Sequence, residues 1–179
     1  MDNPIEFSRP VEVEKIPPRG MDLEITARPE ECAALAKRMG LLALSELSAR
    51  LQLRHIDGGQ VIMVDGEFTA RGTQQCVVTL EPMPVETRES LHGLFAAPEL
   101  VPADTGVTEI ADVFAEEPEP IRDGIIDLGE LTAQHLALAL DPYPRKPGVE
   151  LPKAGAVSNE NSRENPFAKL KDLIKNDKE

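Results

Sequence analysis

Apolar and polar residues alternate through residues 5 to 27, which is the period of strands with one buried face. The sequence Pro17-Pro18-Arg19-Gly20 interrupts this alternation, so the pattern predicts two strands rather than one. A helix is predicted over residues 29 to 39, because Pro29 has no N–H group to leave unpaired and the acids after it suit the positive end of the helix dipole. Gly40 is placed to end this helix.

The period of two returns at Glu46 and continues, with interruptions, to Phe95. Alternate residues of the first stretch are aliphatic and polar, namely Leu47, Ala49, Leu51 and Leu53 against Ser48, Arg50, Gln52 and Arg54. Asp57-Gly58-Gly59 is a hairpin signal, and a second strand is predicted to follow as far as Gln75. Residues 76 to 80 are expected to continue as a third strand segment, with alternation again from 85 to 95. The pattern predicts an antiparallel meander.

A short strand at 124–126 and a helix at 127–140 are predicted next. Asp127-Leu128-Gly129-Glu130 has the pattern of a capping box, and prolines at 142 and 144 end the helix. One face of this helix is expected to carry Leu128, Leu131, His135 and Leu138. The core domain is expected over 5–148, followed by a linker at 149–164 and a short amphipathic helix at 165–175. A helix this short must dock on its own domain or on a partner to persist in water.

Charge limits the classes of partner. The 179 residues include 32 Asp and Glu against 19 Lys and Arg, and the formal net charge of -13 argues against generic nucleic-acid binding and against DNA. Residues 99 to 130 hold ten acids and one base, and we interpret 97–122 as an acidic, proline-rich loop. This loop either keeps the protein soluble or attracts a basic protein. The remaining charges nearly balance, so contact with RNA stays open.

The chain lacks the common catalytic motifs: it has no glycine-rich phosphate loop, no G-x-S-x-G, no HExxH and no paired-cysteine zinc spacing. His55, His92 and His135 lie far apart in sequence, which favours structural roles over a ligand set. Cys76 is interpreted as a small core residue of a buried strand. We therefore expect no catalytic residue, no cofactor and no metal. Two cysteines, no signal-peptide pattern and no long apolar run predict a soluble cytoplasmic protein.

Cationic residues are the candidate contacts to RNA or a partner. Arg50 and Arg54 are predicted on the polar face of one strand, and Arg71 on the next. The alternative is that these arginines pair with Glu46, Glu67 and Glu86 on a solvated surface. Tyr143, Arg145 and Lys146 offer one aromatic ring and two cations in a proline-rich turn. The terminal helix adds Phe167, Lys169, Leu170 and Lys171.

Three segments carry a resemblance to a known family. These are CVVTLEP from residue 76, GIIDLGELTAQHLALALDPYPRKPG from residue 124 and NPFAKLKDLIK from residue 165. Together they resemble the YceD family of large ribosomal RNA subunit accumulation proteins, in an alphaproteobacterial form. The resemblance implies a role in the synthesis, processing or stability of large-subunit (23S) ribosomal RNA without catalysis. Many members show C-x-x-C where this chain has Cys76 and Thr79, so a thiolate zinc site is not available here.

The expected protein is thus a single α+β domain with an antiparallel sheet from 5 to 95, the strand 124–126 added to it, and two flanking helices. It is expected to support ribosomal RNA accumulation by binding the precursor of the large ribosomal subunit, through a basic ribosomal protein or the RNA itself. Two other classes remain open: an unrecognised RNA-processing hydrolase, and a small-ligand or protein-interaction module unrelated to RNA. The sequence leaves the oligomeric state unknown.

Overall fold

The computed structural model describes residues 5–101 and 117–149 of the chain. The described residues up to Pro147 form one compact unit. The predicted terminal helix lies outside the described residues, with its candidate contacts Phe167, Lys169, Leu170 and Lys171. The predicted linker, apart from Val149, and residues 102–116 of the predicted acidic loop also lie outside them.

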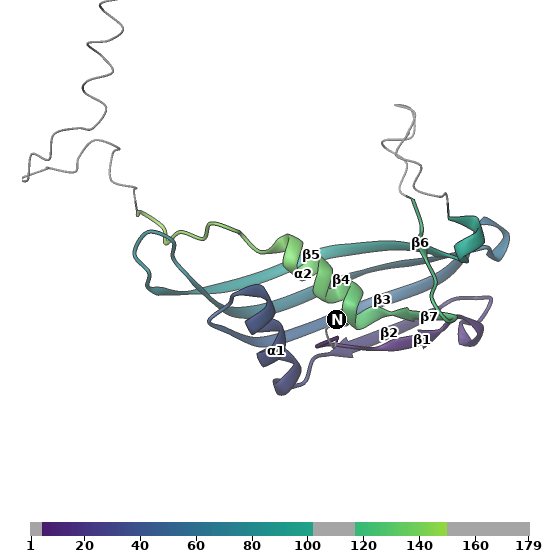
Figure 1. The fold of residues 1–179 in the computed structure, drawn as a ribbon, viewed down its shortest axis with the longest axis horizontal. Helices are drawn as coiled ribbons and strands as arrows, with labels where there is room; N and C mark the ends of the chain where they lie inside the picture. The colour runs from purple at the N-terminus through teal and green to yellow at the C-terminus, as the bar shows by residue number, and fades with distance from the viewer. Residues whose placement is uncertain (1–4, 102–116, 150–179) are drawn as a thin grey trace, which may run out of the picture. The chain divides into compact units, whose positions relative to one another are not determined.

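A five-stranded sheet is the main element of the first unit, in the order β2-β3-β4-β5-β6 (Figure 1). Its strands are β2 (Met21–Thr26), β3 (Ala43–Ile56), β4 (Val61–Gln75), β5 (Pro82–Ala96) and β6 (Glu119–Pro120). Strands β2 to β5 pair antiparallel with their neighbours, and β6 is parallel to β5. The helices are α1 (Pro29–Met39) and α2 (Leu128–Ala139), with 3-10 turns at Val13–Lys15, Asp57–Gly59 and Pro98–Leu100. The predicted α+β class, with an antiparallel sheet and two helices, is confirmed.

The alternation of β3 divides the sheet into a buried and a solvent-facing surface. Leu47, Leu51 and Leu53 are buried, whereas Arg50 and Arg54 on the other face are exposed. Strands β3 and β4 approach closely at Gly66 of β4, where a Cβ atom would lie 2.2 Å from the carbonyl oxygen of Arg50 on β3. Only glycine fits there without moving the strands apart.

Helix α1 begins and ends where its sequence predicts. Pro29 takes the first helical position, and the backbone N–H of Arg28 donates to Glu31 Oε2 over 2.7 Å. Gly40 ends the helix in the left-handed conformation, with φ of 68°. In α2, Asp127 caps the first turn by accepting hydrogen bonds from the backbone of Gly129 and Glu130.

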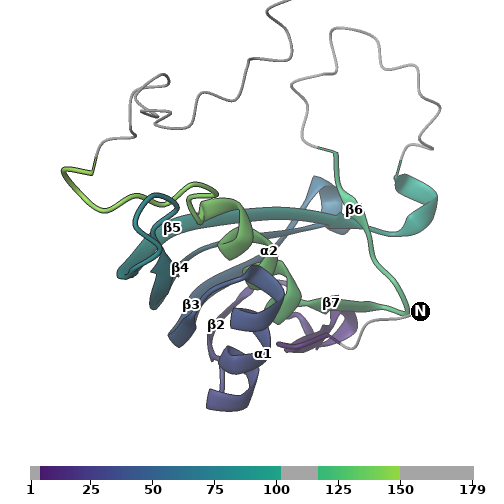
Figure 2. The same ribbon diagram turned by 60° about the vertical axis from the view of Figure 1, so that its left-hand side comes forward.

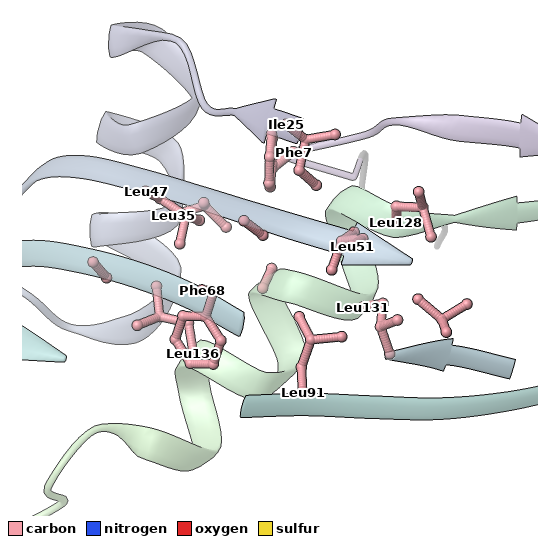
Figure 3. Close-up of a cluster of buried hydrophobic side chains, with 14 of the residues drawn as sticks. Phe7, Ile25, Leu35, Leu47, Leu51, Phe68, Leu91, Leu128, Leu131 and Leu136 are labelled. Atoms are coloured by element: carbon pink, nitrogen blue, oxygen red, sulfur yellow. The ribbon is translucent and has the colours of Figure 1, made fainter. Parts of the chain in front are cut away.

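Both helices cover the same face of the sheet (Figure 2). The core between them is aliphatic, with two phenylalanines, Phe7 and Phe68, fully buried in it. Figure 3 shows Leu35 from α1 and Leu131 and Leu136 from α2 directed toward the inward side chains of the strands. The lack of a side chain at Gly93 lets α2 pack close to β5, because a Cβ at Gly93 would lie 3.3 Å from Leu131 Cδ1.

The N-terminal segment is bound to the start of α2. Its strand β1 (Pro10–Glu12) pairs antiparallel with β7 (Ile125–Asp127) in a separate two-stranded sheet. Asp127 accepts hydrogen bonds from the hydroxyl of Ser8 and the backbone N–H of Arg9 as well as capping the helix. The prediction that the strand near 124–126 joins the main sheet is therefore wrong. Its partner is more than a hundred residues away in sequence, so no local pattern could identify it.

The predicted strand over residues 76 to 80 is also wrong, since these residues form the turn between β4 and β5. The Cys76 N–H donates to the Glu81 carbonyl, the Leu80 N–H donates to the Cys76 carbonyl, and Leu80 has a φ of 59°. Val77 is consequently exposed rather than buried in a strand.

Two further expectations need correction. Leu138 does not share the buried face of α2, because its side chain is 83% exposed while Leu136 is fully buried. The predicted loop at 97–122 contains a strand, β6, which pairs with the last two residues of β5.

Candidate functional site

The outer face of the sheet carries the predicted arginines. Alternation in the strands places Arg50 and Arg54 on this face of β3. Arg71 lies on the same face of β4, opposite Glu46 of β3. Strand β5 adds Arg88, which pairs in register with Thr69 and which the sequence interpretation missed. Leu91 and Phe95 face inward, and side chains of a strand alternate between its two faces. The alternation of β5 could therefore have placed Arg88 on the outer face.

Each of these four arginines has a carboxylate partner. Arg50 Nε lies 3.4 Å from Glu24 Oε1, and Arg54 Nη2 lies 2.8 Å from Asp65 Oδ2. Arg71 lies 3.0 Å from both Glu46 and Glu86, and Arg88 lies 2.9 Å from Glu67. The hydrogen bond that Arg71 donates to Glu86, and the charge of the two carboxylates, raise the pKa of Arg71.

The sequence left open the alternative that the arginines pair with glutamates on a solvated surface, and the structure shows such pairs. Glu46 and Glu86 both pair with Arg71, whereas Glu67 pairs with Arg88, which is not one of the predicted arginines. Exposed pairs of this kind each stabilise a fold by about 0–1 kcal/mol, so they contribute little to folding. However, carboxylate oxygens already occupy the guanidinium groups as ion-pair partners. A phosphate would have to displace these oxygens to bind there. The outer face is therefore a mixed-charge surface.

A second site lies where the chain after α2 meets the β4–β5 turn. The backbone N–H of Val77 donates to the Pro144 carbonyl over 2.9 Å, and Lys146 Nζ lies 2.7 Å from Glu81 Oε2. Tyr143 is 70% exposed. Arg145 is exposed and forms no ion pair with another of the described residues. Of the two cations next to Tyr143 in the sequence, Lys146 is therefore already paired and Arg145 is not paired within the described residues.

Cys76 lies at this junction and is fully buried. Its sulfur accepts hydrogen bonds from the backbone N–H groups of Thr79 and Lys146, each over 3.5 Å. Hydrogen bonds from the Thr79 side chain, and then from these backbone groups, lower the pKa of the Cys76 thiol to about 6. The sulfur thus belongs to a turn and its long-range contact, and not to the strand that the sequence suggested. Within residues 5–101 and 117–149, no group of three potential metal ligands is found.

Each of the three histidines has an oxygen partner within hydrogen-bond distance. His55 Nε2 lies 3.1 Å from the Ile16 carbonyl, and His135 Nε2 lies 3.1 Å from the His92 carbonyl. His92 Nδ1 lies 2.6 Å from Asp65 Oδ1, beside Arg54. Burial raises the pKa of Asp65, whereas the hydrogen bonds from His92 and Arg54 lower it, and the net pKa is lowered.

A groove with an acidic rim lies between the end of β5, β6, β7 and the first turns of α2. Its volume is about 500 Å³. The chain crosses here from β6 beside the main sheet to β7 beside β1 (Figure 1). The groove is lined by Ile5, Phe95, Glu119, Pro120, Arg122, Asp123, Ile125, Ile126, Asp127, Glu130, Leu131 and Gln134. The sequence indicates the acids of this region but not the apolar floor beneath them.

Comparison with known proteins identifies one family. The family model described as large ribosomal RNA subunit accumulation protein YceD matches residues 64–174, which is more than half of the chain. Searches of curated proteins and of solved structures gave no match. No helix among the described residues has the length and apolar character needed to cross a membrane. The matched region covers β5, the turn with Cys76, β7 and α2, and the chain therefore belongs to the YceD family.

Proposed function

We propose that this protein is a non-enzymatic factor that supports accumulation of 23S ribosomal RNA by binding a basic protein of the large ribosomal subunit precursor. Membership of the family gives the chain a role in ribosome biogenesis. The choice of a protein partner rests on one observation: all four arginines on the outer face of the sheet are paired with carboxylates. Proteins that hold RNA through phosphate contacts need uncompensated cations.

The cellular part of this proposal is tested by deleting the gene and measuring the ratio of large to small ribosomal RNA. The expected result is a lower ratio that a plasmid copy of the gene restores. An unchanged ratio would contradict the proposal.

The binding mode is tested by affinity capture of the tagged full chain from cells, with and without nuclease treatment. Capture of ribosomal proteins should survive the nuclease, because the contact is between proteins. Loss of every ribosomal protein after the treatment would instead indicate that RNA bridges them. Salt dependence provides a second measure, since RNA binding through phosphates weakens steeply as salt rises.

Direct RNA contact is a second candidate, and the Tyr143 site favours it. Tyr143 exposes an aromatic ring on which a base could stack, and Arg145, two residues later in the sequence, is an exposed cation for the phosphate. Crosslinking of full-length protein to RNA in cells, compared between the wild type and Y143A, would detect it. An equal yield of crosslinked RNA from the two proteins would exclude this site.

A further inference from the structure

The acid-rimmed groove between β6, β7 and α2 is held in place by the fold on all sides. A β-bridge joins Arg122 to Ile125, and the tight turn between them uses left-handed backbone at Asp123 and Gly124, with φ of 53° and 70°. Asp127 fixes the start of α2 and the N-terminal segment together. The groove walls are therefore formed by paired backbone.

The floor of the groove is apolar. Phe95, Ile126 and Leu131 are buried beneath it. At its margin, Ile125 is 40% exposed and Ile5 is 51% exposed. These two side chains retain apolar surface that a partner could remove from water, at a gain of about 25 cal/mol for each Å² buried.

The rim of the groove is acidic, with four carboxylates and one guanidinium. Two of the carboxylates already have partners within the fold. Asp127 caps α2, and Glu130 lies 2.9 Å from Arg38 Nη2. Glu119 and Asp123 are exposed and form no ion pair with another described residue, so both can receive a cation from a partner.

We propose that this groove binds a lysine- or arginine-rich protein segment that places one aliphatic or aromatic side chain on Ile125 and Ile5 and its cations on Glu119 and Asp123. The inference rests on the proposed function, because it names the kind of segment that a basic ribosomal protein would present. Carboxylates outnumber the single guanidinium on the rim, which disfavours phosphate and therefore RNA in this groove. The apolar surface favours a segment that also carries an apolar side chain over one that is basic alone.

The test uses the full chain and three fluorescein-labelled peptides of equal length. One peptide contains lysines around a central Leu-Phe pair, the second contains lysines and serines only, and the third replaces every lysine of the first by glutamate. Fluorescence anisotropy should show saturable binding of the first, weaker binding of the second and none of the third. Equal binding of the first and third peptides would overturn the proposal.

Two variants and one control locate the binding site. E119Q/D123N should weaken the first peptide about three- to tenfold, because each lost exposed ion pair is worth up to about 1 kcal/mol. E24Q/E86Q removes the same charge from the outer face of the sheet and should leave the affinity unchanged. I125T should weaken the first peptide about fivefold and leave the second unchanged, because it removes apolar surface alone. Equal affinities for E119Q/D123N and E24Q/E86Q would contradict this location.

The alternative occupant of the groove is a second copy of the chain. Sedimentation of the wild type and I125T across a concentration series separates the two cases. The proposal predicts no difference in association between them, and dimerisation that I125T abolishes would overturn it. Failure of the peptide test with a lowered ribosomal RNA ratio in the deletion strain would refute the groove and leave the proposed function standing. Peptide binding with an unchanged ratio would refute the function alone.

Discussion

At the scale of single residues, an ion-paired carboxylate joins the N-terminal segment to α1. Both carboxylate oxygens of Glu31 accept hydrogen bonds from the Arg9 guanidinium, over 2.8 and 2.9 Å, and Arg28 donates to the same group. The Glu31 side chain is only 6% exposed. The hydrogen bond from Arg9, against an opposing effect of burial, lowers the pKa of Glu31 to about 2.

This arrangement predicts a dependence of stability on pH. The folded-state pKa of Glu31 lies below its unfolded value, so its stabilisation is complete above about pH 4.5 and declines as pH falls toward 2. Glu31→Gln should lower the free energy of unfolding by about 2–3 kcal/mol at pH 7, because it leaves Arg9 without its charge partner. The difference between the two proteins should shrink as pH falls to 2.

Urea unfolding at pH 7, 4 and 2.5 measures this difference. The control is Glu30→Gln, since Glu30 is an exposed neighbour on the same turn of α1. A difference between wild type and E31Q that stayed constant over this range would show that the carboxylate charge is not responsible.

At the scale of elements, the sequence predicts what local pattern determines. The alternation of β3 identifies its buried leucines and its exposed arginines, and proline and glycine mark the two ends of α1. The turn after β4 escapes prediction because Val77 and Val78 favour a strand, while the contact from Val77 to Pro144 lies far away in sequence. The candidate site is similar. Alternation places Arg50 and Arg54 on one face, but their partners Glu24 and Asp65 depend on strand register.

Helix α2 provides a matched test of its buried face. Leu136→Ala should lower the free energy of unfolding by about 2–5 kcal/mol, because Leu136 is fully buried and its truncation leaves a cavity. Leu138→Ala, two residues along, should change it by less than about 0.5 kcal/mol, because this side chain is mostly in solvent. Denaturant titration of both variants measures the difference. Similar losses for the two would mean that Leu138 is covered in solution.

At the scale of the whole molecule, the paired charges and the unpaired carboxylates lie on different surfaces. The outer face of the sheet pairs its arginines, while the groove beside α2 keeps Glu119 and Asp123 exposed. The formal net charge of -13 is therefore not spread evenly over these surfaces. It restrains RNA binding and favours basic proteins.

Releasing the arginines should reverse this preference. In E46Q/E67Q/E86Q, Arg71 and Arg88 lose their ion pairs, so affinity for a single-stranded RNA should rise and its dependence on salt should become steeper. The control E14Q/D57N/E99Q removes equal charge from exposed acids that form no ion pair with a described residue. Filter binding at several salt concentrations compares them. An equal rise in affinity for both variants would show that net charge, and not the release of arginines, governs RNA binding.

The pairing of β1 with β7 has a consequence for the order in which the nascent chain can fold. Strands β2 to β5 are complete once Ala96 has been synthesised, but Phe7 cannot be enclosed until α2 ends at Ala139. At ordinary rates of translation this interval lasts roughly 2–9 seconds. Throughout it, the inner face of the sheet lacks its cover from α2. The core between the sheet and α2 therefore closes only after synthesis has passed Ala139.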